Sequence, residues 1–150
     1  MNSWLRRFFG FWALAGSAIG LAGVFPSLLR VQHLGLTQQI VVGLTVALFG
    51  WGVWCGFAML ESHPGAIRAN RNFWLIQVPV LYSPWLSWSL FSGLQFEVAA
   101  RFSPLRFGID WQVLSAGFFV DVGAGRGPLV VKLNLFAAVA ALYLATRSKR

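Results

Sequence analysis

The sequence has one cysteine and only four acidic residues among its 150. A lone Cys55 excludes an intramolecular disulfide, a thiol pair and a cysteine-based metal cluster. Acidic residues are also absent from the long apolar runs, and none follows Asp121. We therefore expect no metal, no cofactor and no enzymatic activity.

Charge is scarce as well, since 11% of the residues are charged against about 25% in soluble domains. The net charge of +8 comes from Lys and Arg scattered in ones and twos between apolar runs. Nucleic-acid binding would favour a basic patch on one face or a recognisable motif. The pattern instead predicts membrane lipids as partners, with basic residues that set topology.

Four long apolar runs dominate the chain, at residues 8–29, 40–60, 73–93 and 128–146. At about 1.5 Å rise per residue, each run would reach roughly 30 Å as a helix, enough to cross a bilayer. Pro79 and Pro84 predict a kink in the third run. The fold expected is an all-α polytopic membrane protein, with residues 1–150 forming one four-helix domain.

The distribution of Lys and Arg favours cytoplasmic termini. Seven basic residues flank the runs on the side of the termini: Arg6, Arg7, Arg68, Arg71, Arg147, Lys149 and Arg150. Four lie on the other side: Arg30, Arg101, Arg106 and Arg126. By the positive-inside rule, we expect a multi-pass protein of a bacterial inner membrane with both termini in the cytoplasm.

The connection 94–127 has a different pattern. Phe107, Ile109, Trp111 and Val113 alternate with more polar residues, which is typical of a half-buried strand. Similar alternation at 95–98 and 118–122, with breaks near Ser103-Pro104 and 115–117, predicts a short antiparallel β-meander on the outer side.

The segment VDVGAGRG, residues 120–127, resembles motif I of the S-adenosylmethionine-dependent methyltransferases. That resemblance implies a parallel sheet, an amphipathic helix after the loop, and a ribose-binding acid about 20 residues further on. The run after Pro128 is apolar throughout most of its length and contains no acid. The glycines are therefore interpreted as a turn that leads back into the membrane.

Two groups of residues are candidates for function. Aromatic and charged residues near the outer meander are candidates for partner or lipid contact: Trp85, Trp88, Phe107, Trp111, Asp110 and Arg106. Polar residues within the predicted spans form the second group: Gln77, Lys132 and Asn134.

These candidates favour a non-catalytic accessory or assembly subunit, or a partner-binding module, of a membrane complex. The partner would be another membrane protein or a further copy of the chain. The alternative is a small homo-oligomeric transporter or channel that uses the polar residues of the spans. A third hypothesis, an enzyme acting on lipid, has Glu61 and His63 as its best site.

Overall fold

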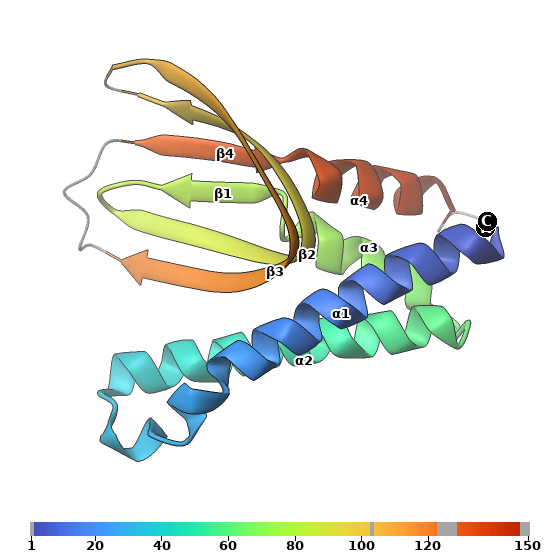
Figure 1. Cartoon of the computed structure of the whole chain (residues 1–150), viewed down its shortest axis with the longest axis horizontal. Coiled ribbons are helices and arrows are strands. Elements are labelled where there is room, and N and C mark those ends of the chain that lie inside the picture. The colour runs from blue at the N-terminus through green and yellow to red at the C-terminus, as the bar shows by residue number, and fades with distance from the viewer. Residues whose placement is uncertain (1, 103, 123–128, 148–150) are drawn as a thin grey trace.

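The structure is a computed structural model that describes residues 2–102, 104–122 and 129–147. Figure 1 shows a long helical hairpin with shorter helices beside it and a curled sheet. In chain order the elements are α1 (Ser3–Leu28), the 3-10 helix η1 (Val31–His33), α2 (Leu36–Leu60), α3 (Ala66–Leu75), β1 (Pro79–Tyr82), β2 (Leu86–Arg101), β3 (Arg106–Val122), β4 (Val130–Asn134) and α4 (Leu135–Arg147).

The prediction of an all-α protein with four spans is wrong. Of the described helices only α1 and α2, with 26 and 25 residues, are long and apolar enough to cross a membrane, judged by length and composition. The predicted span 73–93 contains the end of α3, all of β1 and the first half of β2. The predicted span 128–146 contains β4 and most of α4, a helix of 13 residues.

The error has a physical cause: mean hydropathy does not separate an apolar helix from an apolar strand. Pro79 lacks the amide proton that a helix interior needs, and it occupies the first position of β1, where a strand tolerates proline. Ser87 and Ser89 alternate with Trp88 and Leu90, which is a period of two. Helix α4 would reach only about 20 Å, too short for a bilayer core.

Helices α1 and α2 form an antiparallel hairpin, and small residues set how closely they approach. A Cβ added at Gly56 would lie 2.6 Å from the Leu14 side chain, and one at Gly20 would lie 2.6 Å from the Phe49 ring. At Gly23, further along α1, an added Cβ would meet nothing within 4 Å.

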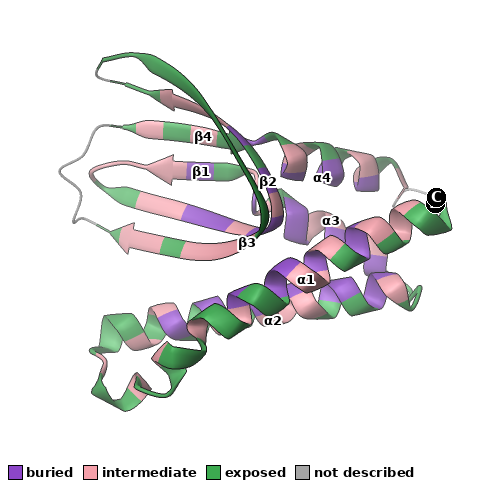
Figure 2. Ribbon diagram, in the orientation of Figure 1, coloured by how far each residue is buried: buried purple, intermediate pink, exposed green. Residues whose placement is uncertain are grey.

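The apolar core lies where all four helices meet, at one end of the molecule (Figure 2). Trp74 of α3 stands edge-on to Phe136 of α4, with 5.3 Å between the ring centroids. Phe9 of α1 and Met59 of α2 belong to the same cluster. The short helices α3 and α4 thus pack beside the first half of α1 and the second half of α2.

Strand β2 organises the sheet. It pairs antiparallel with β3 along its whole length, while its other edge pairs with β1 at residues 87–88 and with β4 at residues 97–101. Strands β1 and β4 also pair antiparallel with each other. All of these pairings can be antiparallel only if the two halves of β2 run in opposite directions, so the β2–β3 hairpin folds back on itself (Figure 1).

The fold-back lies at a β-bulge between Gly93 and Leu94. Gly93 has φ +92°, which favours glycine, and Leu114 on β3 also has a positive φ of 53°. The predicted meander is therefore incorrect, because β3 continues through residues 115–117 where the sequence predicted a turn. The sheet also begins well before residue 94, at Pro79.

The bend of the sheet rests on the middle of α1. A Cβ added at Gly16 would lie 2.1 Å from the Gly93 nitrogen, so the two backbones touch. Beside this contact the buried hydroxyls of Ser17 and Ser92 lie 3.0 Å apart and share a hydrogen bond. The contact fixes the sheet against α1, on the half of the α1–α2 hairpin that contains the turn.

Candidate functional site

Beyond the bend at Gly93, the strands β2, β3 and β4 have one mainly polar and one apolar face. Residues paired across antiparallel strands share a face, and successive residues alternate between faces. Glu97 is paired with Asp110 on one side and with Asn134 on the other, and Ala99 with Lys132. The polar side chains Gln95, Glu97, Asp110, Gln112, Lys132 and Asn134 therefore share one face, and Phe96, Val98, Phe107, Ile109, Trp111, Val131 and Leu133 share the other.

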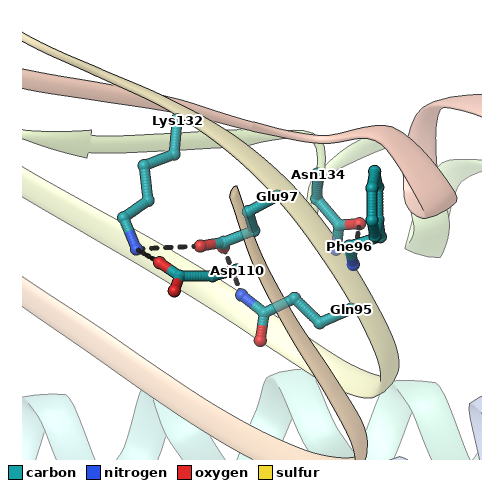
Figure 3. Close-up of polar contacts among 6 residues, drawn as sticks. All are labelled: Gln95, Phe96, Glu97, Asp110, Lys132 and Asn134. Atoms are coloured by element: carbon teal, nitrogen blue, oxygen red, sulfur yellow. Dashed lines mark hydrogen bonds and ion pairs between the residues drawn. The ribbon is translucent and has the colours of Figure 1, made fainter. Parts of the chain in front are cut away.

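A buried ion pair lies at the centre of the polar face (Figure 3). Glu97 of β2 is only 2% exposed, and its Oε2 lies 2.9 Å from the Lys132 Nζ of β4. The same ammonium lies 3.2 Å from Oδ2 of Asp110 on β3. The Gln95 amide donates to the other Glu97 oxygen. One cation thus links three strands and separates two carboxylates that face each other in register.

The electrostatics of this cluster favour the protonated ammonium of Lys132. Burial alone would lower the pKa of Lys132, but the hydrogen bond and charge of Glu97, followed by those of Asp110, outweigh burial and raise that pKa above its usual value. A cation held by two carboxylates satisfies most of its donors. The cluster is therefore best suited to holding the curled strands together.

Asn134 joins the sheet to α4. Its Oδ1 accepts from the Ala137 N–H at 3.2 Å and from the Phe96 N–H at 3.4 Å. The first contact satisfies one of the free amides of the first turn of α4. Gln77, in the turn between α3 and β1, is fully buried, and its amide donates to the Phe73 carbonyl at 3.1 Å.

A cavity of about 250 Å³ opens beside the ion pair, toward the tip of the β2–β3 hairpin. Its lining includes Ala99, Gly108, Arg101 and Arg106, and the two arginines lie directly opposite each other in the sheet. Like charges in directly opposed positions destabilise a sheet. Within the described part of the chain, neither arginine forms an ion pair.

The apolar face of the hairpin is open. Residues 106–114 of β3 are all exposed, with Phe107 at 75% and Trp111 at 72% (Figure 2). The outer edge of β3 pairs with no other strand among the residues that the structure describes. The hairpin thus presents two unsatisfied surfaces together, an apolar face and a row of free backbone amides and carbonyls.

The residues predicted for partner contact lie in different settings. Trp85 is exposed between β1 and β2, whereas Trp88 packs edge-on against Phe118, with 5.4 Å between ring centroids. Phe107 and Trp111 share the open face described above. Asp110 and Arg106 share the polar face of β3, and Asp110 is the one that contacts Lys132.

The residues predicted to be polar groups inside membrane helices do not lie in such helices. Lys132 and Asn134 lie in β4, and Gln77 lies in a turn. The candidate residues predicted from sequence did not include Glu97 or Gln95, whose amide donates to that carboxylate. Their spacing of two on a strand was the available signal.

Two further sequence candidates have less support from their surroundings. Glu61 and His63 approach to 4.0 Å, and both side chains are about two-thirds exposed. Val120–Val122 end β3, but the glycine-rich segment 123–127 lies outside the described residues. No group of three or more His, Cys, Asp or Glu side chains lies together in the described parts of the chain.

Comparisons with protein-family models, with curated proteins and with solved structures found no match.

Proposed function

We propose that this protein is an integral membrane protein that acts without catalysis, as an accessory or assembly subunit that binds its partner through the β2–β3 hairpin. The observation that carries the proposal is the inverted polarity of the sheet beyond the bend at Gly93. Beyond the bend, Gln95, Glu97 and Asn134 are buried beside Lys132, while Phe96, Phe107, Ile109 and Trp111 are exposed on the other face. Exposed apolar surface of this extent marks contact with lipid or with another protein.

The helices support the same proposal. Helices α1 and α2 meet the length and composition of membrane spans, and their outward side chains are apolar, among them Phe11, Ile19, Leu44 and Trp54. The sheet is fixed to the middle of α1 through Gly16. If the hairpin crosses the bilayer, the apolar face of the sheet meets the acyl chains beside it.

Charge supports one orientation. The start of α1 and the end of α4 lie at the same end of the molecule (Figure 1). Arg6, Arg7, Arg68, Arg71 and Arg147 belong to the elements that meet there. Arg30 lies at the opposite turn of the α1–α2 hairpin. By the positive-inside rule this arrangement favours both termini in the cytoplasm of a bacterial cell, with the protein in the inner membrane.

The alternative of a channel or transporter depended on polar residues inside a third and a fourth span. Those residues lie in a strand and a turn instead, and we do not retain that alternative.

Lipid contact can be tested by a fluorophore on single cysteines in a Cys55→Ala background. Ile109→Cys places the probe on the apolar face and Gln112→Cys places it on the polar face of the same strand. In vesicles, we expect lipids with brominated acyl chains to quench the probe at position 109 and to spare the probe at 112. Equal, weak quenching at both positions would contradict lipid contact by the sheet.

Orientation can be tested by impermeant maleimide labelling of whole cells. His33→Cys lies at the far turn of the helix hairpin and His63→Cys at the near one, and both positions are exposed. We expect labelling at position 33 in intact cells, and at 63 only after permeabilisation. The reverse pattern would refute the orientation, and release of the protein by alkaline carbonate would refute membrane integration.

A further inference from the structure

The open edge of β3 requires a partner more strongly than any other surface of the described chain. Along residues 106–113, roughly four N–H and four C=O groups point away from β2, because alternate residues turn toward each edge of a strand. Open edges of this kind do not occur in hydrocarbon, and in water they template pairing with another strand. No Lys, Pro or bulge protects this stretch of β3.

We propose that the edge is covered by β3 of a second copy of the chain, paired antiparallel about a twofold axis at Gly108. This inference rests on the proposed function, and it names the partner. An antiparallel neighbour keeps polar and apolar faces matched only in registers that pair even-numbered with even-numbered residues. Among these registers, charge selects the one centred on Gly108.

In that register, Arg106 lies opposite Asp110 of the second copy, and symmetry repeats the pair. On the other face, Phe107 lies opposite Ile109 of the second copy. A register centred on Ile109 leaves both charges without a charged neighbour, while one centred on Asp110 places two carboxylates together. Opposite charges in directly opposed positions stabilise a sheet, and like charges destabilise it.

The surroundings of the two charged residues fit this pairing. The Asp110 side chain is still 64% exposed after its contact with Lys132, so it can accept a second cation. Arg106 lies opposite Arg101, a like charge that a carboxylate from outside would offset. A Cβ at Gly108 would meet nothing within 4 Å, so the strand is open at the proposed axis.

Disulfide crosslinking in native membranes tests the register. In a Cys55→Ala background, Gly108→Cys puts two cysteines directly opposite each other, where Cβ atoms lie about 4.5–5.5 Å apart and a disulfide can form after small adjustment. Gln112→Cys is the matched control, because eight residues of offset separate its two copies by roughly 27 Å. We expect covalent dimers at position 108 and none at 112.

Charge exchange tests the pairing itself. Arg106→Asp alone and Asp110→Arg alone oppose like charges twice in each homodimer, and we expect roughly a tenfold or greater loss of crosslinking at position 108. When the two variants are co-expressed with different tags, each Asp meets an Arg again, so crosslinking returns between unlike chains only. Gln112→Asp is the control, because it adds a carboxylate to the same face of β3 at a position that lies opposite no strand residue of the second copy. It should leave crosslinking at position 108 unchanged.

Several results would overturn the inference: no dimer at position 108, equal dimers at 108 and 112, or no recovery in the mixed pair. A crosslink from position 108 to a different protein would also overturn it, because the edge would then have another occupant. Arg106→Asp keeps the test valid if Asp110→Arg fails to fold, because Arg106 forms no described ion pair. Carbonate resistance and lipid quenching at 109 without a dimer would remove this inference and leave the proposed membrane role intact.

Discussion

The contact between Gly16 and the bend of the sheet gives the sharpest test of the fold. Replacing Gly16 by Ala adds one methyl group, which would lie 2.1 Å from the Gly93 nitrogen and 2.5 Å from the Gly93 Cα. Both atoms belong to the backbone, so neither can move aside by changing rotamer. To reach an ordinary contact of 3.4 Å, the sheet and α1 must separate by about 1.3 Å.

The expected cost has two parts. Overpacking a close contact typically destabilises by about 1–3 kcal/mol. Separation also breaks the buried Ser17–Ser92 hydrogen bond, and leaving buried hydroxyls unpaired costs about 1–3 kcal/mol more. Alanine favours a helix over glycine by about 1 kcal/mol, which offsets part of this. We expect Gly16→Ala to lower the free energy of unfolding by roughly 2–4 kcal/mol.

Gly23→Ala is the matched control in the same helix. A Cβ at Gly23 meets nothing within 4 Å, so only the helix preference remains, and stability should rise by up to about 1 kcal/mol. Thermal unfolding in detergent can be followed by tryptophan fluorescence, since the chain has eight Trp. At about 2–4 °C per kcal/mol, Gly16→Ala should lower Tm by roughly 5–15 °C.

Equal Tm values for the two variants would refute the packing of the sheet on α1. Should Gly16→Ala fail to accumulate, a second measurement decides the point. Ser17→Cys combined with Ser92→Cys, in a Cys55→Ala background, should form an intramolecular disulfide, because the two side chains already touch. No disulfide under mild oxidation would contradict the contact.

Two further predictions concern stability in the same detergent assay. Glu97→Ala removes a buried carboxylate and leaves the Lys132 and Gln95 donors with one partner fewer, so we expect the free energy of unfolding to fall by about 2–4 kcal/mol. Asp110→Ala changes an exposed position and should lower it by less than about 1 kcal/mol. Similar losses for the two variants would mean that Glu97 is not the buried centre of the cluster. Gly65 has φ +82° at the start of α3, so Gly65→Ala should cost about 1–2 kcal/mol, while Gly43→Ala in α2, which meets nothing within 4 Å, should be neutral or stabilising. A stabilising Gly65→Ala would show that α3 does not begin in that conformation.

The α1–α2 hairpin was largely predictable from sequence. Two runs of about 20 apolar residues without a charge need a long helix or a deep core, and the predicted runs 8–29 and 40–60 overlap α1 and α2 over most of their length. The strand character of residues 107–113 was also predictable, because period-two alternation is a local property. Neither property depends on what the segment packs against.

The remainder depended on contacts between distant residues. Residues 86–93 and 130–134 lie within long, mainly apolar runs of the sequence. They form strands because β2 pairs with β1, β3 and β4. Glu97 and Lys132 are 35 residues apart, so no spacing rule could have joined them. Asp110 was a predicted contact residue because of its neighbours in sequence, but its ion pair with Lys132 forms only once β2 folds back.

By itself, the sequence determined the apolar helix hairpin, the scarcity of acids and the alternating face of β3, since each follows from the order of neighbouring residues. Only the tertiary structure decided that Gln95, Glu97 and Asn134 are buried and that, among the residues the structure describes, the outer edge of β3 pairs with no strand. The reason is the bend at Gly93, which reverses β2 and lets β1 and β4 occupy its other edge. The position of that bend is set by close contact with Gly16 on α1, a residue 77 positions earlier in the chain.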